Sequence, residues 1–164
     1  MKKQYNKPWY FVSAVLLASL YLTACSNSST PVSTTKSFAV MVVNATNNQP
    51  FSPVAVVAHD ASYSVWSIGS AASTDLEYIA EGGSNSQLLA SLANKDASAV
   101  SGAAAIGPGA SETISLKTSS LTQEKVTLVT MLVNTNDAFV GLRSVDVSTL
   151  EIGESITLLS LIHI

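Results

Sequence analysis

Short runs of β-branched and apolar residues, separated by turn-forming residues, most constrain the fold of this chain. Residues 112–118 alternate strictly between polar and apolar side chains, which predicts a strand with one buried face. Residues 125–133 are almost continuously apolar, as expected of a strand that is covered on both faces. Residues 38–44 and 54–58 have the same character, and Pro53 suits the position just before a strand. The chain is therefore expected to be mainly β.

One stretch, residues 73–95, has helical periodicity. Its apolar residues recur at helical spacing, at Leu76, Ile79 and Ala80 and again at Leu88, Leu89 and Leu92. Ser73 stands where the first helix should begin, and Asn85 is expected to cap a second one. Gly82 and Gly83 lie between the two groups. Two short helices are therefore expected inside a β protein.

Two further strands are predicted at residues 144–147 and 155–158. Residues 98–109 are rich in small side chains and end in a Gly-Pro-Gly turn signal. Several strands at short spacing with one helical excursion indicate an antiparallel β-sandwich with a short helical insertion. We place this domain at residues 37–157.

The N-terminus has the pattern of an export signal. It begins with three lysines (Lys2, Lys3 and Lys7) and has no acidic residue before Asp60. The apolar run over residues 9–22 is short for a membrane span. The run ends in Leu22-Thr23-Ala24-Cys25, which resembles the lipobox of bacterial lipoproteins, where the cysteine becomes the lipidated N-terminus. An ordinary signal peptide with an incidental cysteine is the alternative.

The lipobox interpretation assigns residues 1–24 to a lipoprotein signal peptide and residues 25–36 to a lipidated cysteine with a flexible Ser/Thr tether. Several acyl chains on Cys25 would hold the protein stably on a lipid bilayer. Ser26 resembles the residue that sorts lipoproteins to the outer membrane. We therefore expect a lipid-anchored protein of the bacterial cell envelope, at the outer membrane.

Composition excludes several classes of protein. Eight Lys and Arg against eleven Asp and Glu leave no basic surplus for nucleic acid. One cysteine and two histidines cannot supply an internal disulfide or a structural zinc site. Loss of residues 1–24 removes three lysines and no acid, which takes the net charge from −3 to −6. The mature domain is acidic and favours cations as ligands.

Few residues have the pattern of a functional site. The loop Asn134-Thr135-Asn136-Asp137 follows the apolar strand, and its oxygen-rich side chains suit either a turn or a hard cation such as calcium. The residues alone favour the turn. His59 and Asp60 are expected to serve packing and turn capping, because no partner nucleophile accompanies them.

The remaining candidates have structural explanations. Glu81 is expected at a solvated helix end, and Tyr63, Trp66 and Phe139 are expected to anchor the core. No phosphate loop, nucleophile elbow or metalloprotease helix is present in the sequence. The protein is therefore not expected to be an enzyme. A hydrolase would need turnover that depends on His59 or Asp60.

The ordered set of motifs in the body of the chain resembles the spondin N-terminal domain family. The matching blocks are Asn47 with Gln49-Pro50-Phe51-Ser52-Pro53, Ala58-His59-Asp60, Tyr63-Ser64-Val65-Trp66, Gly69-Ser70-Ala71-Ala72-Ser73, Leu76-Glu77 with Ile79-Ala80-Glu81-Gly82-Gly83, and Met131 through Asp137 to Gly141. Bacterial lipoproteins with this domain look similar, and animal relatives are the matrix proteins F-spondin and mindin. The resemblance covers about residues 38–157 and implies an antiparallel β-sandwich.

The resemblance also implies a calcium site. On this basis the favoured role of Asp137 changes from a turn residue to a metal ligand. The family's other carboxylates come from a later Tyr-Asp-Ala-Gly-Thr-Asp-like segment, which this sequence lacks. Residues 158–164 are mostly apolar and resemble a translated adapter tail, so we expect a non-native ending and a sandwich that is truncated at its C-terminal end. The alternative is a genuine short variant that ends in an apolar strand.

The sequence therefore predicts a lipid-anchored, calcium-binding spondin-type domain that makes cell-surface or adhesive contacts with a protein or glycan. The alternative is a calcium-independent envelope lipoprotein that binds a small ligand or a protein partner. The adhesive role comes from the animal relatives by analogy of fold.

Overall fold

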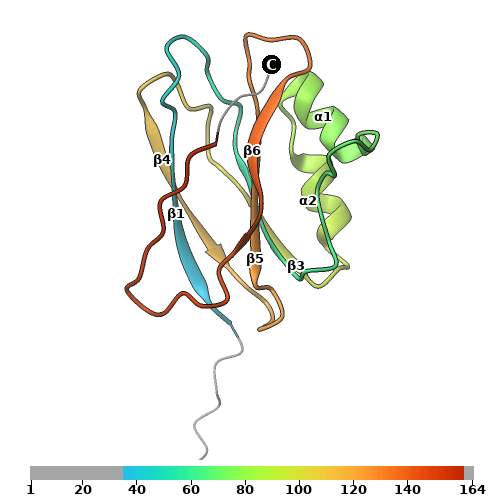
Figure 1. The fold of residues 1–164 in the computed structure, drawn as a ribbon. Helices are drawn as coiled ribbons and strands as arrows, with labels where there is room; N and C mark the ends of the chain where they lie inside the picture. Colours follow the sequence, from blue (N-terminus) through green and yellow to red (C-terminus); the bar gives the residue numbers. More distant parts are fainter. Residues whose placement is uncertain (1–34, 161–164) are drawn as a thin grey trace, which may run out of the picture. The chain divides into compact units, whose positions relative to one another are not determined.

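Residues 35–160 are described by a computed structural model of the chain, which contains six strands and two helices (Figure 1). In chain order these are β1 (Ser37–Val43), β2 (Ala55–His59), α1 (Thr74–Gly82), α2 (Ser86–Leu92), β3 (Ala97–Ser101), β4 (Ser111–Lys117), β5 (Lys125–Met131) and β6 (Phe139–Asp146). The mainly-β prediction with a short helical insertion is confirmed. Within the described residues, neither helix has the length and apolar character that crossing a membrane requires.

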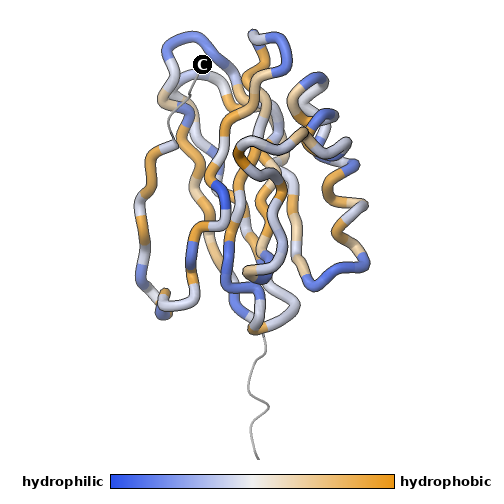
Figure 2. Tube along the Cα trace, turned by 45° about the vertical axis from the view of Figure 1, so that its right-hand side comes forward, coloured by the Kyte–Doolittle hydropathy of each residue, from blue (hydrophilic) through white to orange (hydrophobic). Residues whose placement is uncertain are grey.

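The strands form two antiparallel sheets. One has four strands in the order β3-β2-β5-β6, and the other pairs β1 with β4. Between the sheets lies a first apolar core that combines residues of β1 and β4 with residues of the larger sheet. Figure 2 shows the same segregation along the trace, with hydrophobic residues recurring along the strands and hydrophilic ones at the turns. The two sheets of the predicted sandwich therefore share this first core.

The helices cover the other face of the four-stranded sheet and create a second core. Successive residues of β2 alternate between the cores, because Val56 and Ala58 pack in the first and Ala55 and Val57 in the second. The second core also contains Ile79 of α1. A strand that is covered on both faces favours apolar residues at most positions, which explains the nearly continuous apolar runs in β2 and β5.

The first helix has the predicted termini. Ser73 caps α1 by accepting a hydrogen bond from the backbone N–H of Leu76 at 3.3 Å. Gly83 ends the helix in the left-handed region, with φ of 66°, and its N–H donates to the carbonyl of Ile79. A Cβ at Gly83 would lie 2.8 Å from Cβ of Ser52, so this position also brings the helix close to the sheet.

The second helix corrects a prediction. Asn85 stands at the N-cap position of α2 but makes no capping hydrogen bond with its side chain. Its Nδ2 donates to the carbonyl of Pro53 at 3.0 Å and to Oγ of Ser101 at 2.8 Å. Pro53 precedes β2 and Ser101 ends β3, so the amide joins the helix to the sheet. A tertiary contact has replaced the local cap.

Three strand predictions differ from the structure. Residues 97–101, which overlap the start of the small-residue stretch, form β3, for which no strand was expected. The strand predicted at residues 144–147 corresponds to the last three residues of β6, which begins at Phe139 and ends at Asp146. Residues 155–158 form no strand, and their side chains are exposed. The alternation of polar and apolar residues at 155–158 was therefore not sufficient to predict a strand.

Candidate functional site at the loop end of the sandwich

Three loops meet at one end of the sandwich, which we call the loop end: residues 44–50, 102–110 and 132–138. Asn44, just after β1, is fully buried and holds the first two loops together. Its Nδ2 donates to the carbonyls of Gln49 at 2.8 Å and Ile106 at 2.9 Å. Its backbone N–H donates to the carbonyl of Ala110 at 2.9 Å. One buried amide therefore satisfies backbone groups of two loops.

The third loop is fastened to the first by its own hydrogen bonds. The backbone N–H of Asn134 donates to Oε1 of Gln49 at 2.6 Å, and its Nδ2 donates to the carbonyl of Asn48 at 3.0 Å. The N–H of Val133 donates to the carbonyl of Pro50 at 3.0 Å. The loops therefore form a connected surface, and the side chain of Asn134 takes part in its structure.

Asp137 lies at the tip of this end. It is exposed and adopts the left-handed conformation, with φ of 61°, which Asn and Asp tolerate better than most residues. The turn around it is closed by backbone hydrogen bonds from Thr135 to Leu132 and from Leu132 to Ala138, both at 2.9 Å. The turn interpretation of this loop is confirmed by that geometry. The metal-ligand role of Asp137 stays a prediction.

The three loops at this end contain a single carboxylate residue. Calcium takes six to eight oxygen ligands, usually with several carboxylates. No group of three His, Cys, Asp or Glu side chains comes together anywhere in residues 35–160. The loop carries one carboxylate, that of Asp137, and the amide of Asn134 already bonds to Asn48. The described residues therefore supply no cluster of three acidic, histidine or cysteine side chains for a calcium ion.

His59 and Asp60 lie at the opposite end of the sandwich. His59 is fully buried, with Nδ1 at 2.7 Å from the carbonyl oxygen of Asp60 and Nε2 at 2.8 Å from Oγ1 of Thr127. A carbonyl only accepts, so Nδ1 carries the hydrogen and Nε2 accepts from the hydroxyl. The same hydroxyl accepts the N–H of Ser144 at 2.9 Å. His59 therefore ties β2 to β5 and β6, and both of its ring nitrogens are hydrogen-bonded.

Asp60 and the aromatic residues also have the predicted structural roles. Oδ1 of Asp60 accepts hydrogen bonds from the N–H and Oγ of Ser62, which forms the expected turn cap. Trp66 and Phe139 meet edge to face with ring centroids 5.4 Å apart, and both pack against the second core. Glu81 is exposed at the end of α1, as expected.

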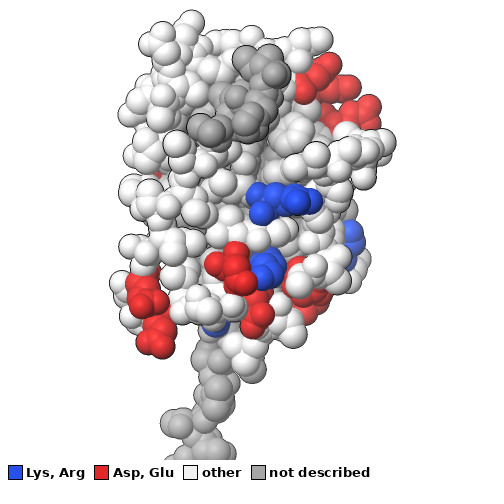
Figure 3. Space-filling view, viewed as in Figure 1, with Lys and Arg blue, Asp and Glu red and all other residues white. Residues whose placement is uncertain are grey.

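The charge on the surface is mixed. Figure 3 shows basic side chains in the middle of one face, with acidic side chains below them and at the upper right. The one ion pair among residues 35–160 joins Lys125 to Asp146 at 2.6 Å, between the ends of β5 and β6. Lys125, followed by Ser148, lowers the pKa of the exposed Asp146 carboxyl. Cys25 and the signal segment lie outside the described residues.

Comparison with known proteins identifies the family of this chain. The spondin N-terminal (Spondin_N) family model matches residues 34–155, nearly all of the described body. No match was found among curated proteins. The domain family is non-enzymatic. The matched segment covers well over half of the 164 residues, and the chain belongs to the spondin N-terminal domain family.

Proposed function

We propose that this protein is an exported, lipid-anchored, non-catalytic contact domain, and that its loop end meets a protein or glycan partner at the cell surface. The arrangement of the two ends of the sandwich carries this proposal. The chain enters β1 at Ser37, opposite the loop end, because Ser37 pairs with Lys117 and Val43 pairs with Ser111. A lipid on Cys25 would therefore be joined to the end that lies away from the loops.

The connected loops support a role in contacts. Seven residues of β1 span roughly 20 Å, which separates the loop end from the anchored end. Binding to a preformed surface loses less conformational entropy than binding to mobile loops. The exposed side chains of the loop end include Val133, four asparagines and one carboxylate, so the surface is almost uncharged.

A matched pair of substitutions tests the contact role. Val133 at the loop end is 42% exposed, and Leu121 at the opposite end is 48% exposed. We expect Val133→Lys to reduce attachment of cells that display the chain by about tenfold, because a lysine at the centre of a contact must be desolvated. Leu121→Lys should leave attachment unchanged. The readout is cell attachment to a protein-coated or glycan-coated surface at equal surface expression.

Two outcomes would contradict this assignment. Equal loss of attachment in both variants would mean that added charge, and not the loop end, decides the result. Unchanged attachment with Val133→Lys would place the contact on another surface. Thermal unfolding of each variant is the control, because both side chains are exposed and their melting temperatures should match the wild-type value.

Calcium binding is the second candidate function, with Asp137 as one ligand. Family membership and the exposed, unengaged carboxylate of Asp137 support it. The other ligands would come from a bound partner or from outside residues 35–160, since the described residues supply no group of three metal-binding side chains. This candidate depends on such additional donors, and the contact function does not.

Asp137→Asn separates calcium binding from folding. Asparagine adopts the left-handed conformation at this position as readily as aspartate, so the melting temperature without calcium should not change. Excess calcium is expected to raise the melting temperature of the wild-type chain by about 2–8 °C and to have no effect on the variant. No calcium effect on the wild-type chain would favour the calcium-independent alternative. Equal effects on both chains would place the ion elsewhere.

A further inference from the structure

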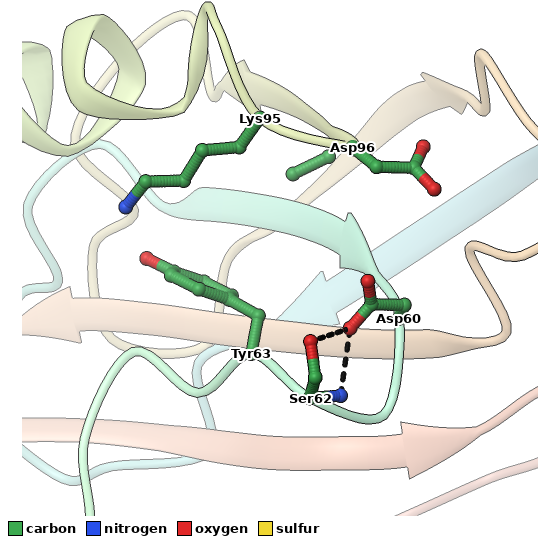
Figure 4. Close-up of a pocket in the computed structure, with 6 residues that line it drawn as sticks. Asp60, Ser62, Tyr63, Lys95 and Asp96 are labelled. Carbon is green, nitrogen blue, oxygen red and sulfur yellow. Dashed lines mark hydrogen bonds between the residues drawn. The ribbon is translucent and has the colours of Figure 1, made fainter.

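A cavity of about 320 Å³ lies at the end of the sandwich opposite the loop end, between the turn after β2 and the start of β3 (Figure 4). It is lined by Asp60, Ser62, Tyr63, Lys95, Asp96 and Ala97. The register places these residues together, because His59 pairs with Ala97 where β2 ends and β3 begins. A cavity of this size can hold a small organic molecule.

One wall of the cavity carries a fixed negative charge. The N–H and Oγ of Ser62 each donate to Oδ1 of Asp60 at 2.6 Å. The hydroxyl and then the amide of Ser62 lower the pKa of Asp60, so its carboxylate is ionised at neutral pH. The backbone of Tyr63 also lowers the pKa of this carboxyl. The turn after β2 therefore orients the carboxylate, and no cation of the described residues pairs with it.

The second carboxylate at this end is already engaged. Asp96 accepts a hydrogen bond from Nε2 of Gln123 at 3.0 Å and a second from the hydroxyl of Thr122. Figure 4 shows its carboxylate directed away from Lys95 and Tyr63. Asp96 therefore shapes the rim, and Asp60 is the negative group available to a ligand.

The facing wall carries a positive charge without an acidic partner. Nζ of Lys95 lies 4.9 Å from the centroid of the Tyr63 ring (Figure 4). Such a contact orients the ammonium group but leaves its three hydrogens unused. Neither Asp60 nor Asp96 forms an ion pair with it, since within residues 35–160 the only ion pair is that of Lys125 with Asp146. The cavity is thus lined by a carboxylate and an ammonium group that form no ion pair with each other.

This juxtaposition fits a ligand that itself carries both charges. We propose that the cavity binds a small zwitterion of the α-amino acid class, with its ammonium group on the carboxylate of Asp60, its own carboxylate on Lys95 and an apolar side chain against Tyr63. The exposed position of Lys95 weakens each charge contact, so the dissociation constant should be in the millimolar range. This binding site is separate from the loop end and does not depend on the contact function.

L-Leucine and two analogues with a single charge test the proposal. 4-Methylpentanoate lacks the amino group, and 3-methylbutylamine lacks the carboxylate. Each is titrated into the ¹⁵N-labelled full chain in detergent, and amide chemical shifts are followed by NMR. We expect leucine to shift the signals of Ser62, Tyr63 and Ala97, and each analogue to bind about fivefold more weakly because it makes one charge contact fewer.

Two conservative variants assign the contacts. Asp60→Asn keeps an oxygen for Ser62 and removes the charge, and Lys95→Gln removes the ammonium group. Each should weaken leucine binding by about fivefold or more. Glu81→Gln and Lys117→Gln, which change exposed charges elsewhere, should not.

Three results would overturn the proposal. The first is the absence of shifts at these residues with leucine. The second is binding of either single-charge analogue as strong as that of leucine. The third is unchanged leucine affinity in both Asp60→Asn and Lys95→Gln. Cell attachment is a separate readout, so failure here would leave the contact function intact.

Discussion

Replacement of Gly141 by alanine is expected to destabilise the domain by about 3 kcal/mol or more, a loss of about 10 °C in melting temperature. Gly141 lies in β6, and a Cβ there would lie 2.0 Å from the carbonyl oxygen of Leu128. It would also lie 3.1 Å from Cη2 of Trp66. The first atom belongs to the backbone of the neighbouring strand β5. Relief of the clash therefore requires the sheet itself to move.

Gly107→Ala is the matched control for this prediction. A Cβ at Gly107 would have no other atom within 4 Å, so alanine there should change stability by less than about 0.5 kcal/mol. Chemical denaturation of both variants provides the measurement. Equal stabilities of Gly141→Ala and Gly107→Ala would show that β5 and β6 are not packed as closely as described.

Replacement of Cys25 by alanine is expected to abolish lipid attachment completely. Cys25 is the single cysteine of the chain, so no other thiol can form a thioether with a lipid. Cells that produce the full chain and are fed an alkyne-tagged fatty acid should label the wild-type protein and leave Cys25→Ala unlabelled. The protein should also leave the membrane fraction, because several acyl chains provide the stable attachment.

Ser28→Ala is the control for lipid attachment, since it changes the same segment without touching the cysteine. It should be labelled and fractionated like the wild-type chain. Equal membrane association of Cys25→Ala and the wild-type protein, with no label on either, would indicate an ordinary signal peptide with an incidental cysteine. That result would remove the anchor from the proposed function and leave the loop-end contact to be tested in soluble form.

Local sequence patterns predicted much of the fold because they depend on short-range geometry. Side chains alternate across a strand, so the pattern of residues 112–118 was sufficient to identify β4. Helical spacing and the cap at Ser73 were likewise sufficient for α1. The turn cap at Asp60 followed from the tendency of aspartate to bond its own turn.

Other features depend on partners that are distant in the chain. β3 consists of small residues with no strand pattern of their own, and it forms because β2 offers five antiparallel partners. Asn85 stands where it could cap α2, but its side chain instead donates a hydrogen bond to the carbonyl of Pro53, 32 residues away in the chain. Residues 155–158 have suitable side chains for a strand, yet they are in no strand in the structure.

The sequence by itself determined the spondin-type motifs, the mainly-β class and the positions of the strongly patterned elements, because neighbouring residues and a fixed period carry that information. Tertiary structure alone decided that Asp60 and Lys95 share a cavity, that Asn44 and Gln49 join the loops, and that Asp137 has no acidic partners within residues 35–160. Those relations depend on sheet register, which is set by the packing of whole strands.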